Sequence, residues 1–390
     1  MKILIATDAW HPQVNGVVRT LGHMAREAPQ LGAAIEFLTP NEFRTLPMPS
    51  YPEIRLALTR PGAVERKLDT IAPDAIHIAT EGPIGHAMRR VCIRRSLPFT
   101  TSFHTLFPDY LAERLPLPER WTRSATWTWL RRFHGAGAAV MAATPTLAAE
   151  LAERGFRNVR LWPRGVDAEL FRPRPHAALD LPRPIFLTVG RLAVEKNLEA
   201  FLALDLPGSK VVVGDGPARA GLARQFPDAV FLGARQGEAL AEIYAAADVF
   251  VFPSLTDTFG LVLLEALASG VPVAAFPAAA PRDVIGRTLE FAPVGVLDND
   301  LRRACLEALE CSREDCRAFA LTMTWEESAR IFLDHVAQAN QVVRTRRGWL
   351  KRRRRAKTVN GVASDAANDV VGDVVLAEPK ARAASPATRR

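Results

Sequence analysis

A regular alternation of short β-branched runs with helix-like stretches constrains the fold of this 390-residue chain more than any other feature. The alternation fills the N-terminal half and starts again after the proline-rich residues 171–184. Strands that alternate with helices form parallel sheets covered on both faces. The runs expected to form strands are 2–8, 35–40, 75–80, 99–104 and 138–144 in the first series, and 184–190, 210–216, 230–233, 249–254 and 271–276 in the second.

The two series predict an α/β protein with two doubly wound, Rossmann-like domains, at residues 1–175 and 182–343. The last helix of the second domain can return to the first. A chain of this length can bury two cores of roughly 150 to 200 residues each. Doubly wound sheets bind ligands at the carboxyl ends of their strands, so we expect a functional cleft between the two domains.

The positive charge of the chain is concentrated in its last 47 residues. Residues 344–390 hold 13 Lys or Arg and four Asp or Glu, a net charge of +9, whereas the whole chain carries +8. Residues 1–343 therefore have a net charge of −1, and we interpret 344–390 as a basic disordered tail. The tail can be attracted to an anionic membrane, at about 1 kcal/mol per basic residue. Nucleic-acid binding is not favoured, because the body is neutral and the tail has only Trp349 for stacking on bases.

The cysteine pattern and the apolar runs bear on metal binding and localisation. The four cysteines form no CxxC pair, which predicts reduced thiols and no metal site. The N-terminal apolar run breaks at Thr7 and Asp8, too early for a signal peptide or a membrane span. We therefore expect a cytoplasmic protein, peripheral on the inner face of the cell membrane.

Residues 253–276 form the most informative motif. A strand ends at Ser254, a polar turn carries Asp257, and a helix is expected to begin near Gly260. Amides at such a helix start can bind an anion or a hydroxyl group. Glu265 follows about one and a half turns along the helix, where it can accept hydrogen bonds from a ribose while Asp257 faces a sugar. The alternative is a solvated acid in a turn followed by an acid on a helix surface.

This motif resembles glycosyltransferase family 4, whose members have the GT-B fold and two acidic residues at this spacing around a Phe-Gly step, here Phe259 and Gly260. The first acid of the family is usually Glu, and Asp257 shortens its reach by about one methylene. The resemblance covers roughly residues 1–340. It implies a nucleotide-sugar substrate and a mechanism that needs neither cofactor nor metal, because the GT-B fold lacks an Asp-x-Asp metal site.

Two cations follow the first strand of the second series. Arg191 and Lys196 can converge on a diphosphate and stabilise it as it leaves. Family 4 carries an Arg and a Lys at this place in that role. Without the family context, two surface cations would explain the spacing equally well.

The opening loop, residues 8–21, contains the step Asn15-Gly16 after the first strand. A turn without a bulky side chain lets a phosphate or sugar approach the backbone. Gly16 corresponds to the glycine-containing loop of the family. Arg19, one turn later, is either an added positive charge at this site or a surface residue.

His104 ends a strand of the first series and begins a stretch that resembles lipid-modifying family 4 enzymes, in which this His lies beside the donor sugar. Glu81 also ends a strand, and it either faces the cleft or caps a helix. The other histidines are interpreted as structural; they are His11, His23, His77, His86, His134, His176 and His335.

Residues 110–134 combine three tryptophans, Trp121, Trp127 and Trp129, with five arginines. A basic and aromatic helix of this kind suits a membrane interface. A core-packing helix with a solvated arginine face is the alternative, and the sequence favours neither.

The resemblance implies donor breakdown through an oxocarbenium-like state, with the acceptor attacking the face that the diphosphate leaves. The expected catalytic residues are His104, Asp257, Arg191 and Lys196. The expected donor-binding residues are Gly16, Arg191, Lys196, Asp257, Phe259, Gly260 and Glu265.

The expected reaction is retaining transfer of a hexose or hexuronate from a UDP-sugar to a membrane lipid such as diacylglycerol. One alternative is a GDP-mannose-dependent α-mannosyltransferase acting on a lipid or polysaccharide. The other is a non-catalytic protein that binds sugar nucleotides, which Asp257 in place of Glu would favour.

Overall fold

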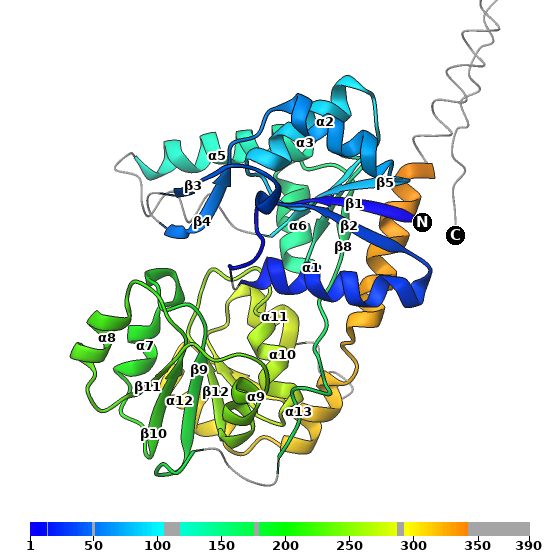
Figure 1. Ribbon diagram of the computed structural model, residues 1–390. Coiled ribbons are helices and arrows are strands. Elements are labelled where there is room, and N and C mark those ends of the chain that lie inside the picture. The colour runs from blue at the N-terminus through cyan, green and yellow to red at the C-terminus, as the bar shows by residue number, and fades with distance from the viewer. Residues whose placement is uncertain (14, 49–50, 105–117, 175–178, 287–291, 342–390) are drawn as a thin grey trace, which may run out of the picture. The chain divides into compact units, whose positions relative to one another are not determined.

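The computed structural model describes residues 1–341, apart from 14, 49–50, 105–117, 175–178 and 287–291 (Figure 1). Residues 1–343 form one compact unit. The predicted tail 344–390 and most of the stretch that follows His104 lie outside the described residues. The domain limits 1–175 and 182–343 remain predictions.

The first sheet has six parallel strands in the order β2-β1-β5-β6-β7-β8. Their bounds are β1 Lys2–Ala6, β2 Ala34–Leu38, β5 Ala75–Ile78, β6 Thr100–Phe103, β7 Ala139–Ala142 and β8 Val159–Leu161. The helices of this half are α1 Gly16–Glu27, α2 Pro61–Ile71, α3 Pro83–Arg94, α5 Glu119–His134 and α6 Pro145–Glu153, with short 3₁₀ turns at Ala28–Leu31 and Pro40–Glu42.

Alternate residues of the inner strand β1 contribute to the cores on the two faces of this sheet. Ile3 and Ile5 pack with Leu21 and Met24 of α1, whereas Leu4 packs in the core that contains residues of α2 and α3. Figure 1 shows α1 on one side of the strands and α2 and α3 on the other. Strands buried on both faces are rich in apolar residues, which is why the run of β1 is visible in the sequence.

The second sheet also has six parallel strands, in the order β11-β10-β9-β12-β13-β14. Their bounds are β9 Ile185–Val189, β10 Ser209–Val213, β11 Val230–Gly233, β12 Val249–Phe252, β13 Val273–Ala275 and β14 Gly295–Leu297. The helices are η3 Val194–Lys196, α7 Leu198–Leu202, α8 Arg219–Gln225, α9 Gly237–Ala246, α10 Leu261–Ala268, α11 Ala279–Ile285, α12 Leu301–Ala308 and α13 Arg313–Ala320. Two six-stranded parallel sheets with helices on their faces confirm the predicted GT-B architecture.

The chain returns to the first sheet at its described end. A helix of residues 325–341 packs Trp325, Phe332 and Val336 into the same core as Ile3 and Ile5. Its Ser328 carbonyl accepts a hydrogen bond from the Trp162 indole at 3.1 Å.

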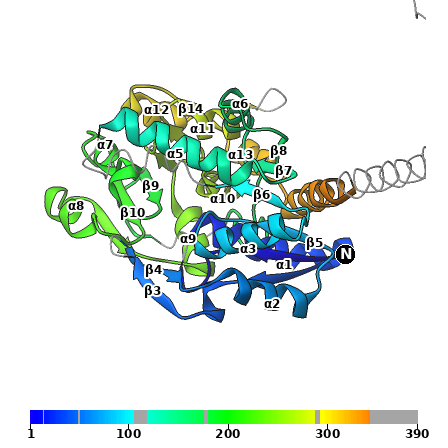
Figure 2. The same cartoon turned by 90° about the horizontal axis from the view of Figure 1, so that it is seen from above.

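All ten expected strands are present, and the described residues contain four more. Two of these, β3 Thr45–Met48 and β4 Tyr51–Ala57, form an antiparallel hairpin, and β8 and β14 are three-residue edge strands. The Trp- and Arg-rich stretch forms the continuous helix α5 (Figure 2). None of the described helices is both long and apolar enough to cross a membrane.

Candidate active site

The turn after β12 carries the predicted acidic motif and is fixed by its backbone. Gly260 is the N-cap of α10 with φ of 78°, a left-handed conformation that favours glycine. A Cβ there would lie only 3.1 Å from both Leu263 Cδ1 and Phe252 Cζ. The Phe259 side chain is buried in the core of this half, so any contact of Phe259 with a donor would come from its backbone.

Asp257 and Lys196 form an ion pair, with Lys196 Nζ 2.6 Å from Asp257 Oδ1. The loops that carry them are also joined by Asn197, whose Nδ2 donates to the Pro253 carbonyl at 3.2 Å. Asp257 Oδ2 is buried and has no hydrogen-bond partner among the described residues. Asp257 therefore has one carboxylate oxygen paired with Lys196 and one oxygen that can still accept a hydrogen bond.

Arg191 lies two residues beyond the end of β9 and is half-buried. Since β9 and β12 are hydrogen-bonded parallel neighbours, the loops that follow them leave the same edge of the sheet. Arg191, Lys196 and Asp257 are thus placed at one edge, as the sequence predicts.

His104 follows β6 of the first sheet and contacts the acidic motif of the second. The Thr258 hydroxyl donates to the His104 carbonyl at 2.9 Å. His104 Nε2 is buried without a hydrogen-bond partner among the described residues, and Nδ1 lies 3.4 Å from Arg164 Nη2. Burial, with the nearby Arg164, lowers the pKa of His104 well below its usual value, so the ring is neutral at pH 7.

Glu265 is buried on α10, and both of its carboxylate oxygens have partners. The Tyr244 hydroxyl donates to Oε2 at 3.0 Å, and Oε1 forms an ion pair with Arg19 of α1. Burial, together with the Glu265 charge, raises the pKa of Tyr244 well above its usual value. Arg19 thus contacts one of the predicted donor-binding residues, and its role as an added positive charge at the donor site stays a prediction.

Gly16 is the first residue of α1, and the preceding Asn15 caps that helix. The Asn15 side chain accepts from the amides of Val17 and Val18, both at 3.0 Å. A Cβ on Gly16 would lie 3.7 Å from Leu261 Cδ1, an ordinary contact. The starts of α1 and α10 therefore face each other, and no positive φ requires glycine at this position.

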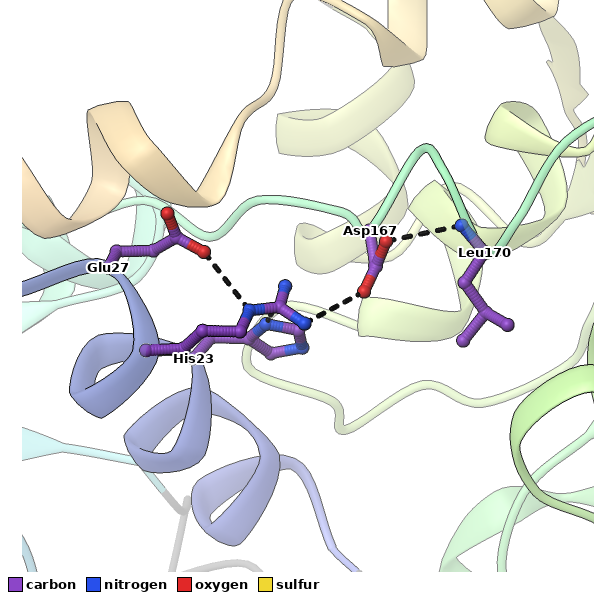
Figure 3. A network of polar contacts seen from close by, with 5 residues as sticks. His23, Glu27, Asp167 and Leu170 are labelled. Atoms are coloured by element: carbon purple, nitrogen blue, oxygen red, sulfur yellow. Dashed lines mark hydrogen bonds and ion pairs between the residues drawn. The ribbon is translucent and has the colours of Figure 1, made fainter. Parts of the chain in front are cut away.

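A polar network connects α1 to residues 165–171, which lead from the first sheet to the second (Figure 3). Arg26 donates to Asp167 at 3.1 Å and contacts His23 Nδ1 at 3.0 Å, and Asp167 accepts from the Leu170 amide at 3.2 Å. His23 also stacks on Trp325, with ring centroids 4.3 Å apart. Burial, with the Arg26 charge, lowers the pKa of His23 to about 4.

Glu81 takes neither of its expected roles. Its Oε1 lies 3.0 Å from Nε2 of the buried His134, a partner that is distant in sequence. The N-terminus of α3 is capped instead by Asp8, which accepts from the amides of Ile84 at 2.8 Å and Gly85 at 3.2 Å. Burial raises the pKa of Asp8 to about 6. No local signal in the sequence predicts this cap, because Asp8 lies two residues beyond β1 and is distant in sequence from α3.

Within the described ranges, no three His, Cys, Asp or Glu side chains come close enough to hold a metal ion. The four cysteines are free, and burial raises the pKa of Cys92, Cys305 and Cys316 to about 12.

Comparison with known proteins places both halves of the chain. Residues 14–170 match the model of Glycosyltransferase Family 4, and residues 183–311 match that of Glycosyl transferases group 1. A GDP-mannose-dependent alpha-mannosyltransferase of Mycobacterium tuberculosis is 33% identical over 329 residues, which cover 77% of this chain and 86% of that protein. An alpha-monoglucosyldiacylglycerol synthase of Streptococcus pneumoniae is 25% identical over 350 residues, 79% of this chain and 78% of that protein.

The fold has counterparts among solved structures. HepE of Anabaena, solved in complex with UDP, superposes with a TM-score of 0.61 over 87% of this chain and 100% of its own, at 15% sequence identity. That likeness supports the arrangement of two parallel sheets. Together with the family matches and the extent of the mannosyltransferase alignment, it identifies the chain as a member of glycosyltransferase family 4 with the GT-B fold.

Proposed function

We propose that this protein is a retaining glycosyltransferase that moves a hexose or hexuronate from a nucleotide sugar to a membrane lipid. Membership in glycosyltransferase family 4 supports the transfer of a glycosyl group. The observation that carries the proposed site is a pair of buried polar atoms without partners among the described residues, His104 Nε2 and Asp257 Oδ2. They belong to segments of the two halves that the Thr258 hydrogen bond joins. Buried polar atoms without partners are rare in folded proteins, and a ligand's hydroxyl groups would satisfy both.

Arg191 and Lys196 are assigned the role of stabilising the nucleotide diphosphate as it leaves. Before the donor binds, the Lys196 ammonium is paired with Asp257. An incoming diphosphate would draw Lys196 to its oxygens and release Asp257 Oδ1 to the sugar. The developing charge on the leaving group is what these cations stabilise, and the departing phosphate can itself accept the acceptor's proton. This chemistry needs no metal and no cofactor besides the nucleotide-sugar substrate, and the acceptor attacks the face that the diphosphate leaves.

Glu265 is assigned to the ribose of the donor. A carboxylate offers about four acceptor positions, and the described side chains that contact the Glu265 carboxylate are Tyr244 and Arg19. The positions that remain can accept hydrogen bonds from the two ribose hydroxyls.

A lipid acceptor and an anionic membrane surface are supported by helix α5. Trp121 is 65% exposed and Trp129 37% exposed, whereas Trp127 is buried against Phe103 and Phe156. Trp127 therefore packs in the core, and the membrane contact is proposed for the exposed Trp121 and Trp129. Exposed indoles beside arginines suit the headgroup region of a bilayer, which would place the enzyme on the inner face of the cell membrane.

A UDP-sugar and GDP-mannose are both candidate donors. The diacylglycerol glucoside synthase of Streptococcus pneumoniae supports a glycolipid product. The GDP-mannose-dependent mannosyltransferase of Mycobacterium tuberculosis, which has the higher sequence identity, supports GDP-mannose as the alternative donor. The residues assigned above contact parts common to both donors.

The test is product formation by the full-length protein on anionic vesicles that contain diacylglycerol. UDP-glucose, UDP-glucuronate, UDP-galactose and GDP-mannose are supplied separately, with and without EDTA, and the lipids are read by mass spectrometry. A glycolipid that forms equally in EDTA, with the anomeric configuration of its donor, would support the proposal. A product only from GDP-mannose would select the mannosyltransferase, and slow donor hydrolysis without any lipid product would refute the lipid acceptor. Nucleotide binding without turnover of any donor would indicate the non-catalytic alternative.

The membrane assignment has its own variants in the same assay. Replacing Trp121 and Trp129 together by Ser should lower vesicle binding and lipid glycosylation while donor hydrolysis is kept. The control Trp127→Ala should instead destabilise the fold by about 3 to 5 kcal/mol, because that side chain is in the core. Unchanged vesicle binding in the double variant would argue against α5 as the docking helix.

A further inference from the structure

Arg164 is a buried arginine that lies three residues beyond strand β8 and is 4% exposed. Its Nη1 donates to the carbonyls of Trp162 at 2.5 Å and Pro163 at 3.4 Å, and its guanidinium carbon lies 4.1 Å from the centre of the Trp162 ring. Among the described residues no carboxylate pairs with it. Burial lowers the pKa of Arg164 to about 9, which leaves the side chain cationic at pH 7.

Among the described residues, Arg164 also contacts His104. Arg164 Nη2 lies 3.4 Å from His104 Nδ1. A guanidinium has only donors, so Nδ1 must be the acceptor in this contact. Because the His104 ring is neutral, its single proton must then be on Nε2, which is the buried atom without a described partner.

We propose that Arg164 is a positioning residue that fixes His104 in the tautomer whose Nε2–H donates a hydrogen bond to an oxygen of the donor sugar. In this arrangement His104 is a donor and cannot act as a general base through Nε2. Asp257 Oδ2, the other unpartnered atom, is an acceptor. The site thus offers one donor and one acceptor to the sugar hydroxyls. The identity of the ligand rests on the proposed function, whereas the tautomer rests on the ligand-free structure alone.

The competing explanation is that Arg164 only stabilises the local backbone through its hydrogen bonds to the carbonyls of Trp162 and Pro163. Arg89 provides a matched control, because it also donates to two carbonyls, of Phe133 at 2.8 Å and Arg132 at 2.6 Å, and lies 5.9 Å from the Phe133 ring. No hydrogen bond of Arg89 to a histidine is found among the described residues. Arg89→Met therefore reproduces the loss of a structural arginine without touching His104.

The first experiment reads the tautomer in the ligand-free, full-length protein. Nitrogen-15 histidine labelling and proton–nitrogen correlation spectra report which ring nitrogen carries the proton, and His104→Ala assigns the signal by its loss. The expected result is Nε2–H in the wild type and in Arg164→Lys, and a measurable Nδ1–H fraction in Arg164→Met. Identical His104 signals in the wild type and Arg164→Met would overturn the proposal, and so would Nδ1–H in the wild type.

The second experiment is a double-mutant cycle on kcat/KM for the donor. Arg164→Met should lower kcat/KM about tenfold, in the range of one hydrogen bond, with partial recovery in Arg164→Lys. If Arg164 acts through His104, adding Arg164→Met to His104→Ala should cost nothing further, whereas Arg89→Met should combine additively with His104→Ala. Additive effects of Arg164→Met and His104→Ala would show a merely structural role.

The two experiments separate this inference from the proposed function. If the spectra show the expected tautomer but no nucleotide sugar is turned over, the positioning of His104 stands and the proposed enzymatic activity is refuted. If a nucleotide sugar is turned over but the effects of Arg164→Met and His104→Ala on kcat/KM are additive, the proposed activity stands and the role of Arg164 is refuted. If Arg164→Met fails to fold, the wild-type spectrum still tests the tautomer, and Arg164→Leu, which also lacks a donor group, replaces Arg164→Met in both measurements.

Discussion

At the scale of single residues, Lys196 has two successive partners in the proposed reaction. It is paired with Asp257 in the ligand-free protein and would stabilise the leaving diphosphate in the transition state. We expect Lys196→Ala to lower kcat about 100- to 1,000-fold, as the loss of one preorganised donor to a developing negative charge commonly does. Initial rates at saturating donor give the value.

Lys210→Ala is the control for this prediction. Lys210 also uses its ammonium inside the protein, but it donates to the carbonyls of Leu202 at 2.6 Å and Leu204 at 2.8 Å, away from Asp257. A similar loss of kcat in both variants would mean that general destabilisation, rather than the diphosphate, explains the effect.

His23 makes stability depend on pH. Burial and Arg26 lower its pKa to about 4, whereas the unfolded chain protonates this histidine near 6.5. Between these pH values the unfolded state binds the extra proton, so acidification from about 6.5 to 4 should cost up to about 3 kcal/mol of stability through this group. His23→Gln should flatten this part of the pH dependence in denaturant titrations. Equal slopes for the two proteins would show that folding does not lower the pKa of His23.

At the scale of elements, the starts of α1 and α10 carry two glycines with different requirements. Gly260 has a left-handed φ and tight neighbours, so Gly260→Ala should lower the free energy of unfolding by about 1 to 2 kcal/mol. A Cβ at Gly16 meets only an ordinary contact, so Gly16→Ala should keep wild-type stability.

The functional expectation for Gly16 is the reverse. If a donor phosphate approaches the start of α1, the added methyl group of Gly16→Ala should raise the donor's KM without a change in melting temperature. Thermal melts combined with donor titrations measure both effects. A stable Gly16→Ala variant with unchanged KM would remove Gly16 from the donor site.

The elements also show which parts of the fold the sequence predicts. Most of the ten expected strands are found because they are short runs rich in apolar residues that are buried in the cores, whereas β6 is buried although three of its four residues are Thr or Ser. The hairpin β3–β4 was missed because proline and charged residues interrupt its apolar residues. The edge strands β8 and β14 were missed because Arg160 and Gly295 interrupt their short apolar runs. For α5, the sequence could not separate the core Trp127 from the exposed Trp121.

At the scale of the whole molecule, the basic residues 344–390 can be tested apart from the enzyme. Residues 1–343 form a compact unit with a net charge of −1. A protein that ends at Val343 should keep its free energy of unfolding within about 0.5 kcal/mol and its rate of donor hydrolysis. Its binding to anionic vesicles should fall at least tenfold at low salt, since each basic residue near the surface contributes about 1 kcal/mol.

Vesicle sedimentation at low and high salt measures this change. The difference between the two proteins should shrink as salt screens the charges. Equal binding at low salt would assign membrane attachment to residues 1–343 alone, with α5 as the first element to test.

The sequence by itself determined the two parallel sheets, the turn and helix of the acidic motif, and the cations after β9. These features depend on neighbours within one strand, turn or helix, so local patterns of apolar, glycine and charged residues are sufficient to predict them. Tertiary structure decided which side chains meet. The contacts of Arg164 with His104 and of Thr258 with His104 span 60 and 154 residues, and Arg19 reaches Glu265 from the other half of the chain. Such pairs exist only because the packing of the two sheets brings distant strand ends together, and no local pattern records that packing.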